Sequence, residues 1–352
     1  MGKYKLINNV LGWIVFAIAS TVYLMTMEPT ASFWDCGEFI SSAYKLEVGH
    51  PPGAPFFMLT ANLFTQLASD PSTVAKMVNT MSALFSGLTI LFLFWSITHL
   101  ARKIMVKDGE EASLGQMITV MGSGLVGALA YTFSDTFWFS AVEGEVYAYS
   151  SLFTAVVFWL ILKWEAVADK PHADRWIVLI AYLMGLSIGV HLLNLLCIPA
   201  IVLVYYYKKF PNPTMKGTLV ALLASFAIVA LMMYGVVQGL VEVCGYFELL
   251  FVNVLGMPYN SGVFAYVIIV AGVLIWSIWE TMRDEIHPTR MKIAFILSVV
   301  LIGIPFIGSG YVLAVILTAA LSLYLFKSKK VDIKTLNTIL VCLMVVVVGY
   351  SS

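Results

Sequence analysis

The sequence predicts an all-α, polytopic membrane protein. Of its 352 residues, 61% are hydrophobic and 11% are charged, and the mean hydropathy is +0.92. A water-soluble domain carries about 25% charged residues, so a soluble class is excluded. The apolar segments have close to the roughly 20 residues that a helix needs to cross a bilayer, and short charged stretches separate them.

About eleven membrane spans are expected from these apolar runs. They cover residues 10–27, 78–100, 114–133, 146–162, 177–190, 192–206, 219–237, 263–279, 293–307, 311–326 and 336–349. The first run lacks a signal-peptide cleavage site and is long enough to span, so we expect it to remain as an anchor. The last run reaches the outer side as the chain ends at Ser352, and we expect a soluble region beyond it.

The basic residues orient this bundle. If Lys3 and Lys5 lie inside the cell, alternate loops place 18 of the 20 basic residues inside and leave only Lys45 and Lys76 outside. This is the bias that the positive-inside rule requires. It also requires two short spans, rather than one, between residues 175 and 208. The inner basic clusters are expected only to set the topology.

The first outer segment, residues 28–76, is predicted to carry two interfacial helices. Residues 35–47 have the pattern of an amphipathic helix that lies at a membrane surface. The glycines and prolines of residues 49–55 then break the chain, and residues 56–67 can resume as a second short helix. If this second helix spanned the membrane, Arg102 and every later basic cluster would change side.

Asp35 and Glu38 are the first candidates for catalysis. They are three residues apart, so on a helix both carboxylates share a face. One can then deprotonate a hydroxyl while the other orients it or raises its partner's basicity. The structural alternative is that Ser32 caps the helix and Asp35 completes a capping box. Spacing alone leaves both interpretations open.

Four other outer residues are candidates for binding an anionic group. His50 is fixed before two prolines, and His191 and Asn194 lie at the tip of the hairpin between two short spans. His50, His191 and Lys45 are candidate ligands of a phosphate, because the outer side has few other basic side chains, and Asn194 is a candidate for binding the donor sugar or phosphate. The alternatives are a turn histidine at position 50 and, at position 191, a histidine that caps backbone carbonyls.

The second outer loop adds two carboxylates, Glu143 and Glu145, at the start of the next span. Ser140 and Glu143 have the spacing of a capping box, which favours a structural role for Glu143. Glu145 has no such partner and can face a cavity.

The remaining patterns are less specific. Phe33, Trp34, Trp138 and Phe139 are expected to form an interfacial belt rather than a platform that stacks on sugars. The four cysteines have no metal-ligand spacing and are expected to be buried thiols. Neither a Walker loop nor a dinucleotide fingerprint is present, and no nucleic-acid partner is expected.

Four sequence runs together resemble a known family. They are Phe33-Trp-Asp-Cys-Gly-Glu-Phe-Ile40, Gly49-His-Pro-Pro-Gly-Ala-Pro55, Val142-Glu-Gly-Glu-Val-Tyr147 and Gly189-Val-His-Leu-Leu-Asn194. These runs are similar to the multi-spanning bacterial family related to animal transmembrane protein 260, a protein O-mannosyltransferase, and more widely to GT-C glycosyltransferases. The resemblance implies a GT-C-like transmembrane catalytic domain over residues 1–352, with an acidic residue of the first outer loop at its active site. It also implies a soluble C-terminal region that this chain does not include.

Residues and resemblance together imply an inverting glycosyltransferase. An outer active site cannot use cytosolic nucleotide sugars, so the donor would be a sugar, by the resemblance mannose, on a polyprenyl phosphate. The acceptor would be a Ser or Thr of an exported protein, and Asp35 and Glu38 would be the catalytic carboxylates. The residues expected to bind the donor sugar or phosphate are His50, His191, Lys45, Glu145 and Asn194. A divalent metal is compatible with this site, and no residue pattern requires one.

The expected location is the bacterial inner membrane, with the site facing the periplasm. Sequence chemistry alone equally permits a lipid or glycan acceptor. A transporter or flippase is the alternative from another class, and it would show paired charges near mid-membrane and an inverted repeat. The acidic residues instead lie near span ends, and no two halves of the sequence look alike. A structural scaffold would not need acidic residues and histidines gathered at one surface.

Overall fold

The computed structural model describes residues 2–351 except 52, 108, 308–310 and 329–331. Pro52 of the predicted chain break, and Lys329 and Lys330 of the predicted inner basic residues, therefore lie outside the described residues. The described residues form helices and no strand, which confirms the all-α prediction. The chain divides into two compact units, Met1–Val204 with Gly349–Ser352, and Tyr205–Val348. The single GT-C-like domain expected over residues 1–352 stays a prediction.

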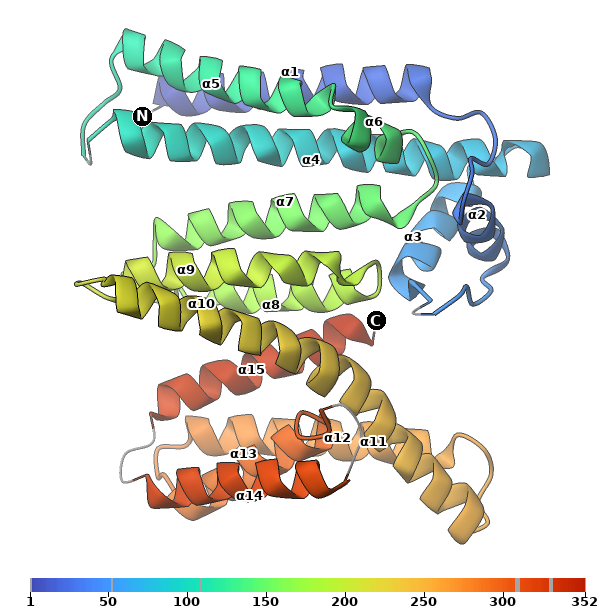
Figure 1. Ribbon diagram of the computed structural model, residues 1–352, viewed down its shortest axis with the longest axis vertical. Coiled ribbons are helices and arrows are strands. Elements are labelled where there is room, and N and C mark those ends of the chain that lie inside the picture. Colours follow the sequence, from blue (N-terminus) through green and yellow to red (C-terminus); the bar gives the residue numbers. More distant parts are fainter. Residues whose placement is uncertain (1, 52, 108, 308–310, 329–331, 352) are drawn as a thin grey trace. The chain divides into compact units, whose positions relative to one another are not determined.

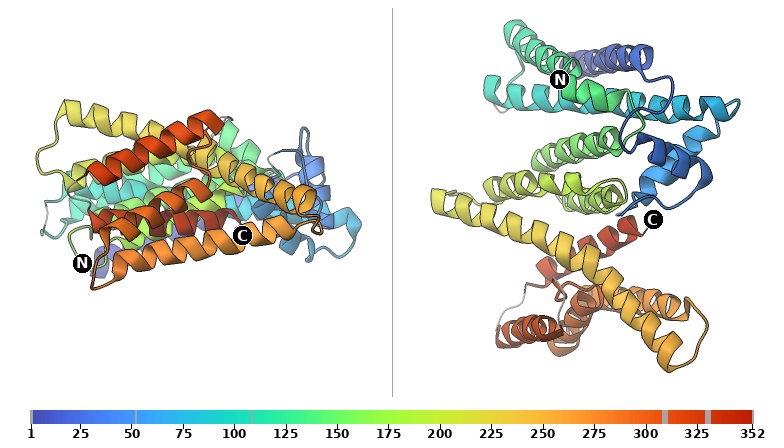
Figure 2. Two further views of the ribbon diagram at one scale, coloured as in Figure 1. Left: turned by 90° about the horizontal axis from the view of Figure 1, so that it is seen from below. Right: turned by 45° about the vertical axis from the view of Figure 1, so that its right-hand side comes forward.

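The first unit is built around one long central helix. Helix α4 packs against α1, α5 and α7, and these helices run side by side in Figures 1 and 2. Short helices occupy the loops between them. The elements are α1 (Gly2–Thr26), α2 (Cys36–Lys45), α3 (Pro55–Thr65), η1 (Pro71–Thr73), α4 (Val74–Met105), α5 (Leu114–Thr132), α6 (Asp135–Ala141), α7 (Val146–Glu165), α8 (Arg175–Ile188), η2 (Leu192–Cys197) and the first part of α9 (Ile198–Lys209).

The second unit contains a helical stretch that is longer than the span predicted for it. Met215–Val254 is helical over 40 residues, whereas the predicted span covered only 219–237. The stretch contains no proline, so nothing stops the helix where the span should end. Its segments are α10 (Met215–Ala230), η3 (Leu231–Val237), α11 (Gln238–Leu249) and η4 (Leu250–Val254), and α12 (Ser261–Met282), α13 (Pro288–Leu301), α14 (Tyr311–Lys327) and α15 (Ile333–Tyr350) follow.

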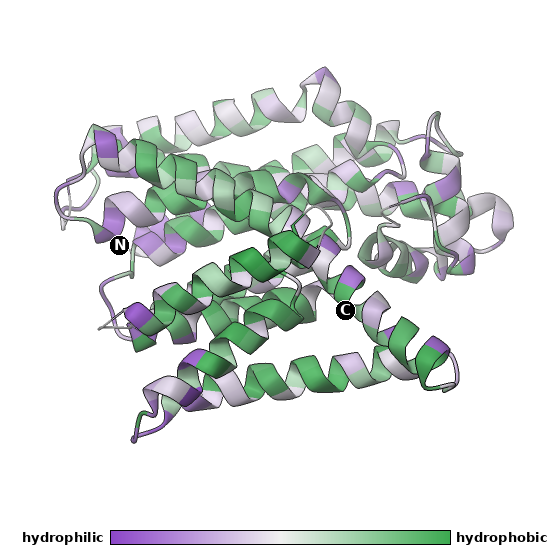
Figure 3. Cartoon of the chain, turned by 60° about the horizontal axis from the view of Figure 1, so that its bottom comes forward, coloured by the Kyte–Doolittle hydropathy of each residue, from purple (hydrophilic) through white to green (hydrophobic). Residues whose placement is uncertain are grey.

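The helices have the character of membrane spans. Eight helical stretches of the described residues are long and apolar enough to cross a membrane. Hydrophobic residues cover the helices along their length, and hydrophilic residues gather at helix ends and in loops (Figure 3). The predicted spans at 177–190, 293–307 and 311–326 fall on α8, α13 and α14, which have 14, 14 and 17 residues. The polytopic class is confirmed, and the count of about eleven spans stays a prediction.

The two short helices predicted in the first loop are present. Helix α2 buries one face, with Cys36, Phe39, Ile40 and Ala43, against a core that includes residues of α3. Helix α3 has 11 residues, too few to cross a bilayer. Both helices lie between α1 and α4 in the chain. The loop that contains them carries the candidate site residues Asp35, Glu38 and His50.

Candidate active site

Backbone hydrogen bonds hold the first and second loops together. The Glu28 N–H donates to the Val142 carbonyl at 3.0 Å. The buried Asn79 side chain on α4 donates to the carbonyls of Glu28 and Thr30, at 2.7 and 3.0 Å. These bonds satisfy loop backbone that would otherwise be buried without partners. They bring the loop that carries Asp35 next to the turn before α7.

A glycine allows the close approach of these loops. A Cβ atom at Gly144 would lie 3.0 Å from Asn79 Oδ1, 3.0 Å from Ile40 and 3.1 Å from Val78. Any larger residue at this position would push the turn away from α2 and α4.

We expect Gly144→Ala to destabilise the protein by about 1 to 3 kcal/mol, the usual cost of overpacking a filled site. Gly122→Ala is the matched control, because no atom lies within 4 Å of its added Cβ. The measurement is thermal unfolding in detergent. Equal melting temperatures for the two variants would show that the loops can separate without cost.

The α8–η2 hairpin docks onto the start of α3. The Gly189 carbonyl accepts hydrogen bonds from the N–H groups of Phe56 at 2.7 Å and Phe57 at 3.2 Å. These donors lie in the first helical turn, where no intrahelical acceptor exists. The hairpin therefore supplies the acceptor, and His191 comes to lie beside the first loop.

Four of the predicted site residues line one pocket of about 90 Å³. They are Asp35, His50, Glu145 and His191, and they come from three separate loops. The remaining walls are Phe39, Gly53, Ala54, Val146, Tyr147 and Val190. A pocket of this size holds a few water-sized groups, such as a phosphate or the reacting end of a larger molecule.

Asp35 is positioned as a reactive group rather than as a cap. It occupies the N-cap position of α2, but its side chain makes no capping hydrogen bond, and it is exposed. The Ser32 hydroxyl instead hydrogen-bonds the Glu143 carboxylate. The capping box between Ser32 and Asp35 is therefore not formed. Trp34, the residue before Asp35, has a φ of 60°, a strained conformation that is common at functional sites.

Glu38 holds His50 in place instead of lining the pocket. Its Oε1 accepts the His50 backbone N–H at 2.5 Å, and its Oε2 lies 3.1 Å from the His50 ring Nδ1. Both interactions hold the pKa of Glu38 below its ordinary value. Both carboxylate oxygens are thus engaged, which makes Glu38 a positioning residue for the histidine.

The two glutamates of the second loop are buried beside Asp35. Glu143 is 5% exposed and hydrogen-bonds Ser32 and Cys36. The predicted capping box of Ser140 and Glu143 is wrong, because Ser140 lies within α6. Glu145 is 6% exposed and does have a capping role, since its Oε2 accepts the Val146 N–H at 2.9 Å. Burial raises the pKa of Glu143, and it raises the pKa of Glu145 to about 7.

This shift makes the stability of the fold depend on pH. The pKa of Glu145 rises from an ordinary value of 4.5 to about 7, so between these values the folded protein holds a proton that the unfolded chain releases. The contribution of Glu145 to stability is therefore fully present below about pH 4.5 and is lost as the pH rises to about 7. We expect the melting temperature in detergent to decline over this interval. The decline should be shallower in Glu145→Gln, and an unchanged slope would show that Glu145 titrates normally.

His191 acts as a neutral hydrogen-bond donor to the pocket. Its ring Nδ1 accepts the Leu193 N–H at 3.1 Å and caps η2, so the histidine caps a backbone N–H and not the carbonyls that the structural alternative named. The proton must then sit on Nε2, which leaves an N–H for a ligand. Burial lowers the pKa of His191 and favours this neutral form. The ring packs against Tyr147, with centroids 5.4 Å apart.

Two predicted residues lie apart from the pocket. Lys45 ends α2, at the opposite end of the helix from Asp35, and lies 4.0 Å from Glu47. Asn194 is fully buried and hydrogen-bonds Ser187 at 2.8 Å and Thr154 at 3.3 Å. These bonds link the hairpin to α7 and α8, so the Asn194 side chain stabilises the packing of these elements.

An apolar groove of about 630 Å³ adjoins the pocket. It runs between α4, α5, α7 and η2, and Tyr147 lines both the groove and the pocket. Tyr147 was not among the predicted site residues, although it ends one of the four family-like runs. Groove residues are spread over four elements, so no local pattern could have revealed them.

Three side chains could hold a divalent cation. One ligand atom from each of Asp35, Glu38 and His50 lies within 4.8 Å of the others. Two carboxylate oxygens and one imidazole suit Mn²⁺ or Zn²⁺ with added water, and they are fewer than the six oxygens typical of Mg²⁺. Such an ion would compete with the contacts of Glu38 to His50. It would supply positive charge next to Asp35.

The fold and the pocket define a class: a polytopic helical membrane protein whose loops form an acidic, histidine-containing pocket beside an apolar groove. Residues 35–214, about half of the chain, match the family described as the protein O-mannosyl-transferase TMEM260 N-terminal domain. The chain belongs to this family, and every predicted site residue lies inside the matched region.

Curated relatives support the same family. Protein O-mannosyl-transferase TMEM260 of Mus musculus is 28% identical over 174 residues, which are 49% of this chain and 22% of the mouse protein. The Dictyostelium discoideum protein of the same name is 25% identical over 187 residues, 51% of this chain and 21% of its own length. The chain thus spans about a fifth of the curated relatives it matches. No solved structure is significantly similar to the chain.

Proposed function

We propose that this chain is the membrane part of a glycosyltransferase that moves mannose from a polyprenyl phosphate to Ser or Thr hydroxyls of exported proteins. The observation that carries the proposal is one pocket lined by Asp35, His50, Glu145 and His191, which meets an apolar groove at Tyr147. The relatives' printed name, protein O-mannosyl-transferase, supports the choice of sugar and acceptor.

The reaction is a single displacement. The acceptor oxygen attacks the anomeric carbon while the bond from that carbon to the phosphate oxygen breaks, and the configuration inverts. Asp35 takes the hydroxyl proton as general base, which its exposed and uncapped carboxylate permits. The polyprenyl phosphate leaves with the bonding electrons. His50 and the Nε2–H of His191 line the same pocket and stabilise the charge that develops on this phosphate.

Glu145 has a different role from Asp35. With a pKa of about 7 it is partly protonated near neutral pH, so it can donate a hydrogen bond to a sugar hydroxyl or to the phosphate. Two ionised carboxylates beside a phosphate would repel it. The buried, partly neutral Glu145 avoids this repulsion, while Asp35 stays free to accept the proton.

The groove supports a lipid-linked donor. Its lining is mainly apolar and includes Leu93, Ile97, Leu100, Phe158 and Leu193. A nucleotide would gain little from such walls, whereas an isoprenoid chain buries apolar surface against them. The shared Tyr147 would lie where the chain ends and the phosphate begins.

The proposed active site faces the periplasm of a bacterial inner membrane. In a background without the four native cysteines, an impermeant thiol reagent should label single cysteines at Ser134 and Asn260 from outside. A cysteine at Ser328 should be protected until the membrane is opened. Asp108, also expected inside, lies outside the described residues. The reverse pattern would put the pocket in the cytosol and contradict a flipped lipid donor.

The function is tested with reconstituted protein, mannosyl polyprenyl phosphate and an acceptor peptide. We expect transfer to Ser or Thr with this donor and none with a nucleotide sugar. Ala155→Trp fills the groove and should abolish transfer, whereas Val126→Trp makes the same kind of change on the exposed face of α5 and should not. Transfer from the nucleotide sugar, or full activity of Ala155→Trp, would refute the lipid donor.

A further inference from the structure

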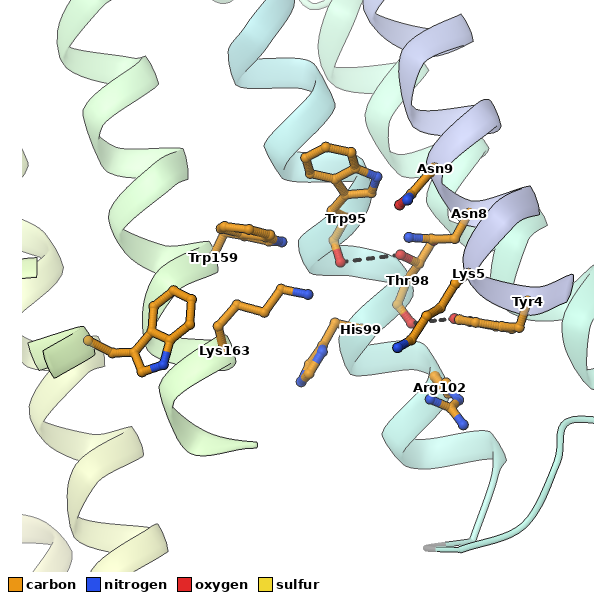
Figure 4. A pocket seen from close by; sticks show the side chains of 11 residues that line it. Tyr4, Lys5, Asn8, Asn9, Trp95, Thr98, His99, Arg102, Trp159 and Lys163 are labelled. Carbon is orange, nitrogen blue, oxygen red and sulfur yellow. Dashed lines mark hydrogen bonds between the residues drawn. The ribbon is translucent and has the colours of Figure 1, made fainter. Parts of the chain in front are cut away.

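A second polar pocket lies at the other end of the first unit. It has a volume of about 500 Å³ and is formed by the start of α1, the last turns of α4 and α7, and the start of α8 (Figure 4). The candidate active site follows the end of α1 and precedes the start of α7. The two pockets therefore belong to opposite ends of the same helices, and the mechanism above uses no residue of the second.

The second pocket has an uncompensated positive charge. Lys5, Arg102 and Lys163 line it, and none of its described lining residues is acidic. Among the described residues, no carboxylate forms an ion pair with any of these three cations. Nearby Glu165 is already paired with Lys103 at 2.6 Å.

Such a cluster is costly without a counter-ion. Lys5 lies close enough to Lys163 for the two charges to repel each other. Arg102 and Lys163 are half-buried, and such charged side chains of membrane helices normally pair with an opposite charge or with a ligand. An anion in the pocket would remove the repulsion.

Buried polar atoms in the same pocket also lack partners. The indole Nε1 of Trp95, the Nε2 of His99 and the amide oxygen of Asn8 are buried and make no hydrogen bond. The Trp95 nitrogen can only donate, and so can the His99 Nε2 in one tautomer. Figure 4 shows Lys163 pointing from α7 toward the α4 side chains, where His99 lies, while the Trp95 indole nitrogen points toward α1.

Aromatic rings hold the cations. Arg102 lies 4.8 Å from the centre of the Tyr4 ring, and Lys163 lies 4.7 Å from that of Trp159. Tryptophan and tyrosine are enriched at the depth of lipid headgroups. Leu6 and Ile104, neighbours of pocket residues on α1 and α4, are 65% and 84% exposed. Phosphate-binding groups next to exposed apolar residues match a molecule with a phosphate head and an acyl tail.

We propose that this pocket binds the phosphate group of an anionic phospholipid. Lys5, Arg102 and Lys163 contact the phosphate, the His99 Nε2–H donates to it, and the acyl chains lie along the exposed apolar residues. The inner basic residues were expected only to set the topology. The pocket gives three of them a ligand.

The test is binding of short-chain phosphatidylglycerol to the purified full chain in detergent, followed by tryptophan fluorescence. Trp95, Trp159 and Trp176 line the pocket and report occupancy. We expect saturable binding by wild type. Binding should be on the order of tenfold weaker in the Arg102→Gln, Lys163→Gln double variant, since each basic group contributes to attraction of an anionic lipid. Lys5 is exposed, so Lys5→Gln leaves the helix packing intact. This variant should weaken binding severalfold.

Three controls separate the outcomes. Lys107→Gln removes one charge beyond the end of α4, outside the pocket, and should bind like wild type. Zwitterionic phosphatidylcholine with the same chains should bind weakly, and equal binding would overturn the anion site. Inorganic phosphate should bind far more weakly than the lipid; equal affinity would refute the lipid in favour of a free ion. Wild-type affinity in both the double variant and Lys5→Gln would refute the pocket itself.

Discussion

Replacing Asp35 by Asn is expected to lower the rate of sugar transfer by about 10²- to 10⁴-fold, the usual loss when a positioned general base is removed. The fold should survive, because the Asp35 side chain makes no capping hydrogen bond and is exposed. The assay is transfer from mannosyl polyprenyl phosphate to a peptide, with the melting temperature measured on the same preparation. Asp135→Asn is the matched control, since Asp135 is exposed at the start of α6 and does not line the pocket.

The same assay separates a base from a metal ligand. If Asp35 acts as the base, treatment with a chelator should leave transfer intact. Loss of activity with the chelator, and recovery with Mn²⁺, would instead make Asp35 a ligand together with Glu38 and His50. Activity near wild type in Asp35→Asn would exclude both roles and move the reaction to Glu145.

Replacing the two histidines should reveal that they serve one group. His50→Ala and His191→Ala are each expected to lose about 1 to 3 kcal/mol of transition-state stabilisation, the range for a hydrogen bond to a charged group. Both side chains line the same pocket, so the double variant should lose less than the sum. The measurement is kcat/KM for the donor in the four proteins. If the free-energy losses of the two single variants add up to that of the double variant, the two histidines contact separate groups of the substrate.

The capping role of His191 needs its own control. His191→Ala also removes the acceptor for the Leu193 N–H, so it should lower stability. His191→Asn can keep this cap, because asparagine is a preferred N-cap residue, but it lacks the Nε2–H. Slow transfer in both variants, with a lower melting temperature only in His191→Ala, is the expected result. Full activity of His191→Asn would leave His191 with the capping role alone.

Several site residues could be predicted because their neighbours in sequence define them. Asp35 follows a loop and begins an amphipathic helix, and His50 precedes a proline pair, so each position is set within a few residues. Glu145 lies at the start of a span and was expected to face a cavity, because an ionisable side chain there is costly unless it faces a polar cavity or a partner. It lines the pocket. Its cap on the Val146 N–H was not predicted, because it does not have the spacing of a capping box.

Other assignments depended on contacts between distant residues and could not be made from the sequence. Glu38 was grouped with Asp35 by spacing, yet it engages His50, twelve residues away. Asn194 was grouped with His191, yet its side chain turns to Ser187 and Thr154 in the core. Helical spacing fixes which side chains share a face, but it does not fix which partner they meet.

The sequence by itself determined that this is a helical membrane protein, which short helices fill its first loop, and which loops carry acidic residues and histidines. These features follow from local hydrophobicity and chain breakers, because a helix satisfies its own backbone in lipid. Only the tertiary structure decided that the Gly189 carbonyl docks on α3, that Gly144 lets two loops meet, and that Tyr147 joins the pocket to the groove. Each of these depends on packing between segments far apart in the chain, where shape and unsatisfied backbone groups, rather than sequence pattern, select the partner.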